Sequence, residues 1–155
     1  DDVRAGSITT PNFVKTLAST LPTANATVVV TNTNDRFEIG TFPLTTTGAG
    51  AVTFLVQYQL SGKVLTMRFK STSVASAAAS VFNIAIGQFP AYLLLPSINT
   101  MAFLIPVLVN NAQVAGSLQI QPTGAVTIGA TPNLGAFTAT QQAGWSDFVV
   151  VMLLG

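Results

Sequence analysis

The sequence predicts an all-β fold in which two antiparallel sheets pack as a sandwich. From about residue 27, short apolar runs are separated by turn residues at fairly regular spacing, which is typical of all-β domains. Several runs alternate apolar and polar residues, the pattern of a half-buried strand. Only 7% of the residues are charged, against about 25% in an ordinary soluble domain. Subunit contacts or uncharged polar side chains must therefore cover much of the surface.

The chain's 155 residues are enough for one domain with its own core. Residues 1–26 mix small, polar and Pro residues with short apolar pieces, so we expect a partly ordered lead-in segment. Residues 27–155 are expected to form the β domain.

The first strands are expected at residues 28–30 and 35–42. In residues 52–60 the even positions are apolar and most odd ones are polar, which predicts a half-buried strand. Ser-Gly at 61–62 turns the chain, and residues 64–70 alternate in the same way. These two runs predict a β-hairpin.

The Ala- and Ser-rich residues 71–80 have no large apolar stripe that a helix could dock, so we expect a loop. Residues 81–87 alternate and predict a strand. Residues 91–95 lie between two prolines and are expected to form an extended crossing segment. Residues 101–109 form an apolar run that contains Pro106, which favours a strand at an edge or a bulge.

The remaining strands are expected at 114–121, 125–130, 137–140 and 145–154, with turns at 110–111 and 122–124. The total of eight to ten short strands matches a two-sheet jelly-roll sandwich.

The closing run at 148–154 does not alternate, so a strand there would have both faces covered. An isolated sandwich leaves one face of such a strand in water. A second subunit is therefore expected against it, with the oligomer interface at Phe148, Val150, Met152 and Leu154.

The composition excludes several functions. The chain has no His and no Cys, which removes the usual general base, thiolate and metal ligands, so we expect no enzyme activity, metal or cofactor. The basic residues are scattered and the net charge is +1, which argues against nucleic acid as a partner. The longest apolar run, 148–154, is far shorter than the roughly 20 residues of a spanning helix, so we expect no membrane insertion.

Four residues are the leading candidates for ligand binding. Trp145 and Tyr92 are candidates for stacking on a sugar, with Tyr58 behind them, and Arg68 and Lys70 for contact with an anionic sugar or a sulfate. The alternatives are that Trp145 caps the end of the sandwich and that the two cations lie on a solvated face.

Two carboxylates leave an enzymatic alternative open. Asp35 and Glu38 are close enough in sequence for a glycosidase-like pair, which needs carboxyl groups about 5–9.5 Å apart. The simpler alternative is a turn acid followed by a solvent-facing strand residue. A polysaccharide-degrading domain is therefore a third possibility, behind a binding domain and a purely structural one.

Several segments resemble a recurrent head domain. They are YQLSGKVLTM at 58–67, FPAYLLLP at 89–96, VLVNN at 107–111, GSLQI at 116–120 and GAVTI at 124–128. Together they resemble the C-terminal head of phage tail fibres and of surface proteins of large algal viruses, which is similar to tumour necrosis factor and complement-type globular heads. The match covers roughly residues 50–154.

The resemblance implies a homotrimeric jelly roll whose last strand lies near the three-fold axis. It also implies a place on the surface of a virus particle. The expected role is attachment to a host cell-surface glycan or cell wall, and the alternative is a structural decoration or trimerisation module without a ligand.

Overall fold

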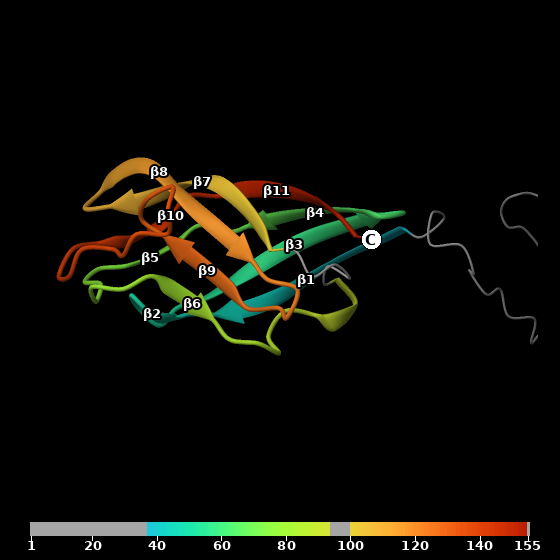
Figure 1. Cartoon of the computed structure of the whole chain (residues 1–155), viewed down its shortest axis with the longest axis horizontal. Helices are drawn as coiled ribbons and strands as arrows, with labels where there is room; N and C mark the ends of the chain where they lie inside the picture. Colours follow the sequence, from blue (N-terminus) through green and yellow to red (C-terminus); the bar gives the residue numbers. More distant parts are fainter. Residues whose placement is uncertain (1–36, 94–99, 155) are drawn as a thin grey trace, which may run out of the picture. The chain divides into compact units, whose positions relative to one another are not determined.

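The computed structural model describes residues 37–93 and 100–154, which belong to a compact unit spanning residues 34–155. These described residues form eleven strands in two antiparallel sheets, so the prediction of an all-β, two-sheet fold is confirmed (Figure 1). The strands are β1 (Phe37–Thr45), β2 (Thr47–Gly48), β3 (Thr53–Ser61), β4 (Val64–Phe69), β5 (Thr72–Val74), β6 (Phe82–Ile84), β7 (Met101–Val109), β8 (Ala112–Ile120), β9 (Val126–Gly129), β10 (Ala143–Trp145) and β11 (Phe148–Leu153).

The smaller sheet has four strands in the order β1-β3-β4-β11. Burial alternates along all of β3, where the even positions 54, 56, 58 and 60 are buried as the sequence predicts. β3 and β4 pair directly, and Gly62 between them has a positive φ of 61°. The predicted hairpin is therefore confirmed.

The larger sheet has seven strands in the order β2-β6-β9-β8-β7-β10-β5. Its centre is the meander β7-β8-β9 (Figure 1). Asn110 and Asn111 join β7 to β8 with φ values of 50° and 65°, as a two-residue type I′ turn requires. The predicted turns at 110–111 and 122–124 are both present.

The core lies between the two sheets and is rich in aromatic rings. Trp145 packs edge-on against Phe54 and Phe82, with ring centroids 4.9 and 5.3 Å apart. Phe69 stacks on Phe148 at 4.9 Å. Each such pair adds about 0.5–1.5 kcal/mol beyond the area that it buries. These contacts join strands of both sheets into one core.

The end of the chain differs from the prediction of one closing strand. Residues 143–145 form β10 in the larger sheet, and residues 148–153 form β11 in the smaller one. The chain passes from one sheet to the other at Ser146 and Asp147.

Burial alternates along β11, so the predicted interface side chains do not face outward. Phe148, Val150 and Met152 are 7%, 4% and 2% exposed and lie in the protomer's own core. Leu154 is partly buried against the same core. The prediction that Phe148, Val150 and Met152 meet a second subunit is wrong, because in the strand paired with β4 these side chains face the core. For Leu154, which follows β11, it stays a prediction. The outward side chains are those of residues 149, 151 and 153.

Three other segments also differ from the sequence-based expectations or refine them. Residues 137–140 form no strand; Phe137 is buried, and its amide donates to the Ser80 carbonyl oxygen in a loop contact. Residues 91–93 form a 3-10 turn rather than an extended segment. Residues 71–80 contain the short β5 and no helix.

The strand β7 lies inside its sheet rather than at an edge. It pairs with β8 along its whole length, but with β10 only through Val107–Val109. Pro106, which has no amide hydrogen to donate, lies one residue beyond that pairing. A proline is tolerated here because the second neighbouring strand stops short of it.

Some predictions concern residues outside those described. The lead-in segment 1–26, the strand at 28–30 and the carboxylate of Asp35 are among them. The jelly-roll connectivity stays a prediction. Within the described ranges, no helix is long and apolar enough to cross a membrane.

Candidate functional site

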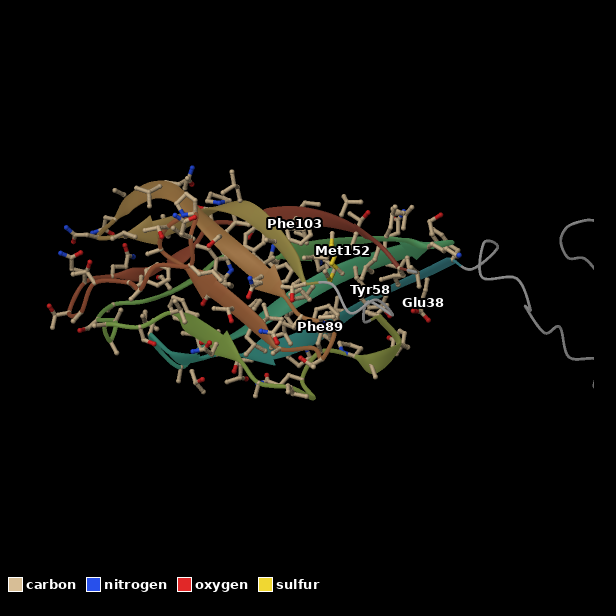
Figure 2. The ribbon with its side chains drawn as sticks, viewed as in Figure 1. Glu38, Tyr58, Phe89, Phe103 and Met152 are labelled. Carbon is tan, nitrogen blue, oxygen red and sulfur yellow. The ribbon has the colours of Figure 1, made fainter. Side chains whose placement is uncertain are left out.

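A hydroxyl and carboxylate cluster lies toward one end of the sandwich. It joins Glu38 of β1, Tyr58 of β3 and Tyr92 of the 3-10 turn Ala91–Leu93. The Tyr58 hydroxyl donates to the Glu38 carboxylate at 3.2 Å, and it lies 2.8 Å from the Tyr92 hydroxyl. Figure 2 shows Glu38 and Tyr58 next to each other at this end. We call these three residues the tyrosine cluster.

The sheet register places Glu38 and Tyr58 on the inner side of the small sheet. Glu38 has the same parity as the buried residues of β1 and is half-buried, so the expectation that it faces solvent is wrong. Tyr58 lies opposite Gly40 on β1. A Cβ atom at position 40 would lie 2.8 Å from the Tyr58 ring, so glycine makes room for that ring.

Aromatic contacts hold the Tyr58 ring in place. Phe42 lies 5.9 Å from Tyr58 and 5.2 Å from Phe89, measured between ring centroids. Tyr58 is only 7% exposed, whereas Tyr92 is 52% exposed. The cluster therefore consists of a fixed inner tyrosine and an outer tyrosine that solvent can reach.

The protonation state of Tyr58 follows from its surroundings. The hydrogen bond with Tyr92 raises its pKa above the ordinary value, and burial and the nearby Glu38 carboxylate raise it further. Tyr58 therefore keeps its proton at neutral pH. When that proton is donated to Glu38, the Tyr92 hydroxyl donates to the Tyr58 oxygen, which gives the hydrogen bonds one direction.

Arg68 and Lys70, the predicted anion-binding pair, are brought together by a residue that the sequence did not single out. Asp147 Oδ2 lies 2.5 Å from Arg68 Nη2 and 3.4 Å from Lys70 Nζ. Its Oδ1 accepts a hydrogen bond from the Ser71 amide at 2.5 Å. This amide, Arg68 and Lys70 lower the pKa of Asp147 to about 2.

The Asp147 carboxylate thus occupies the position that an external anion would take between the two cations. The Arg68 and Lys70 side chains are 50% and 41% exposed. They form a local ion-pair network on a solvated surface, as the alternative interpretation of these two residues held.

Trp145 does not form an exposed stacking surface. It is fully buried, and its Nε1 donates to the Lys70 carbonyl oxygen at 2.9 Å. The prediction that it contacts a ligand is wrong for this reason, and the burial is what the alternative of a capping ring also implied. Of the two predicted sugar-stacking rings, Tyr92 is the exposed one.

The enzymatic alternative named Asp35 and Glu38 as a carboxylate pair. Asp35 lies outside the described residues, so the structure describes only Glu38, which is held by Tyr58. Among the described residues, no group of three or more His, Cys, Asp or Glu side chains is placed to hold a metal ion.

The hydrogen bond between Tyr58 and Glu38 is not predicted by the sequence. One signal was present in the sequence, because Tyr58 is at an inward position of an alternating strand. A buried tyrosine hydroxyl needs a hydrogen-bond partner. The partner itself required the register between β1 and β3, which the sequence pattern does not fix.

Comparison with known proteins finds a distant likeness to solved structures. No protein-family model matches the chain, and no curated protein matches it. Among solved structures, the chain is similar to the sigma1 attachment protein of a reovirus, in complex with α-2,3-sialyllactose. The two are 12% identical with a TM-score of 0.48, and the alignment covers 92% of this chain and 80% of that one.

Proposed function

We propose that this chain is a non-catalytic head domain on the surface of a virus particle, where it forms a homotrimer and attaches to a host-surface glycan. One observation carries the attachment role: Tyr92, with a 52% exposed side chain, has its hydroxyl held in the tyrosine cluster. The resemblance of residues 50–154 to viral head domains, and the jelly-roll connectivity that it implies, supply the expectation of a trimer on a particle.

The chemistry of the tyrosine cluster suits a sugar. A pyranose has an apolar face of C–H groups, which packs on an aromatic ring, and a rim of hydroxyls, which need donors and acceptors. Tyr92 provides the ring, while its hydroxyl and the Glu38 carboxylate supply polar atoms at one edge. Because Tyr58 already orients these groups, less entropy is lost when a ligand binds.

The experiment is a glycan array followed by calorimetric titration of the best glycan. Tyr92→Ala is expected to weaken binding at least tenfold, because it removes both ring and hydroxyl. Tyr92→Phe keeps the ring and is expected to weaken binding about 2- to 12-fold, the value of one net hydrogen bond. Arg68→Gln is the matched control on the other candidate site and should leave the affinity unchanged.

Two results would contradict this site. The first is full affinity in Tyr92→Ala. The second is loss of binding in Arg68→Gln alone, which would assign the ligand to the ion-pair network around Asp147.

A second candidate function is a structural module without a ligand. It is favoured by the outer face of the small sheet, where several large apolar side chains are exposed. Such a module should bind no glycan on the array and no host cell wall, while its assembly stays intact.

A further inference from the structure

We propose that the outer face of the four-stranded sheet is the surface through which copies of this chain associate. The inference rests on the proposed homo-oligomeric head and adds the surface that it uses. It also replaces the predicted interface at Phe148, Val150 and Met152, whose side chains lie in the core. The surface is made by the outward residues of β1, β3, β4 and β11, and we call it the outer face.

The outer face gathers most of the exposed apolar bulk of the described residues. Seven of their eleven exposed large hydrophobic side chains belong to it. β11 contributes Val149, Val151 and Leu153, which are 58%, 54% and 71% exposed, and β1 contributes Phe37 and Ile39 at 63% and 68%. The other two are Leu55 of β3 and Val64 of β4.

The sheet register arranges these side chains in rows. Leu153 lies beside Val64, which is linked through Ser61 to Phe37. The next row on the same face joins Val151 to Ile39 through two polar residues of the central strands. In these two rows the edge strands β1 and β11 carry apolar side chains, and the central strands carry Ser61, Gln59 and Thr66 beside Val64. The two edges of the sheet are therefore its most apolar parts.

Charge does not oppose association on this face. Arg68 is the only charged residue at an outward position of the four strands, all of which the structure describes in full. Its charge is met by Asp147. Two copies can therefore approach without like-charge repulsion and without stripping water from unpaired charges, in keeping with the scarcity of charge at interface centres.

β11 adds an edge that needs cover. It pairs with β4 and is the last strand of its sheet. Exposed edges are usually protected by charged residues, prolines or bulges, and β11 contains no charged residue and no proline. Association that covers this edge would supply the missing protection.

The area agrees with a standard interface. Burying one aliphatic side chain contributes about 1.5–3 kcal/mol, and each Å² of buried apolar surface contributes about 25 cal/mol. One side chain therefore has about 60–120 Å² of apolar surface. Seven side chains, most of them half or more exposed, then offer on the order of 240–480 Å². A standard interface buries about 800 Å² per partner, of which about 57% is apolar. The apolar side chains of the outer face therefore supply about half to all of the apolar area of one such contact.

The test is the mass of the full chain in solution, measured by light scattering at micromolar concentration. The unmodified chain is expected at a multiple of 16.1 kDa. Val151→Lys and Leu153→Lys should each raise the dissociation constant at least tenfold and shift the mass toward one protomer, because they place unpaired charge in the contact. Leu104→Lys is the matched control, since Leu104 of β7 is 73% exposed on the other sheet and the oligomer should persist.

The unfolding midpoint of each variant in urea separates loss of association from loss of fold. An oligomer that survives both outer-face variants would overturn this surface and leave the homotrimer standing. Dissociation by Leu104→Lys alone would move the contact to the seven-stranded sheet. A monomer in the unmodified chain would overturn both the surface and the trimer, whereas glycan binding is tested separately through Tyr92.

Discussion

At the scale of single residues, Asp147 is the centre of an ion-pair network on the surface of the described chain. It lies in the short link between β10 and β11, and it binds Arg68, Lys70 and the Ser71 amide. These contacts tie the crossing between the sheets to the end of β4. Since all three stabilise the charged carboxylate, protonation should loosen the crossing.

The first prediction concerns acid stability. The folded pKa of Asp147 is about 2, below its ordinary value of 3.8. The stabilisation is therefore complete above about pH 5 and is lost as the pH falls toward 2. Asp147→Asn should unfold at lower urea concentration than the unmodified chain at neutral pH, and the gap should close between about pH 4 and 2. A gap that is as large at about pH 2 as at neutral pH would contradict this assignment.

The second prediction concerns Trp145. Trp145→Phe keeps an aromatic ring but leaves the part-buried Lys70 carbonyl without its donor. We expect a loss of about 1–3 kcal/mol in the free energy of unfolding, followed by circular dichroism in urea. Glycan affinity should not change, because the ring has no exposed surface. Weakened binding at unchanged stability would contradict the buried role.

At the scale of elements, the alternation of apolar and polar residues predicted those strands whose two faces differ in polarity. It identified β3, β4 and their hairpin because apolar and polar residues occupy opposite parities there. β11 has apolar residues at both parities, so its sequence cannot say which face is inside. Only its pairing with β4 settles that point.

The switch between sheets after Trp145 was missed for a related reason. The apolar run continues through the break apart from Ser146 and Asp147, and two polar residues are a weak signal for a change of sheet. The 3-10 turn at 91–93 was missed because flanking prolines also suit an extended segment.

The third prediction concerns β10, which lies between β7 and β5. A Cβ atom at Gly144 would clash with the Thr72 carbonyl oxygen and lie 2.6 Å from the Ser73 Cα. Backbone atoms cannot rotate away, so Gly144→Ala should push β5 off β10 and cost at least about 1–3 kcal/mol of stability in urea unfolding.

Gly40→Ala serves as the comparison. There the nearest atoms belong to the Tyr58 side chain, which can move. This variant should lose less stability than Gly144→Ala but more glycan affinity, because the tyrosine cluster is displaced. Equal stability losses in the two variants would contradict the distinction between backbone and side-chain crowding.

At the scale of the whole molecule, charge is scarce and apolar side chains are exposed together. Because charged residues are scarce in the sequence, we expect that other copies or uncharged polar groups cover much of the surface. The sequence could not predict which surface the copies cover, because the outer face is assembled from β1 at one end of the described chain and β11 at the other. The tyrosine cluster has the same origin, because Tyr58 is 20 positions from Glu38 and 34 positions from Tyr92 in sequence.

The fourth prediction concerns salt. An association through the outer face has almost no charge to screen, so its mass by light scattering should be the same in about 0.1 M and 1 M NaCl. An interface held by ion pairs would weaken over this range. Dissociation at high salt would therefore contradict an apolar contact.

The register of the small sheet has a consequence for how the domain is held. Phe37, where β1 starts, and Leu153, where β11 ends, lie in the same row across the sheet. Figure 1 shows the end of β11 and the start of β1 at the same end of the domain, and the β7–β8 turn at the opposite end. A tether joined to the start of β1 or to the end of β11 would therefore hold the domain at one end. The β7–β8 turn would then point away from the tether. Glu38 is next to Phe37, so the tyrosine cluster lies on the flank near such a tether, not at the end that carries the β7–β8 turn.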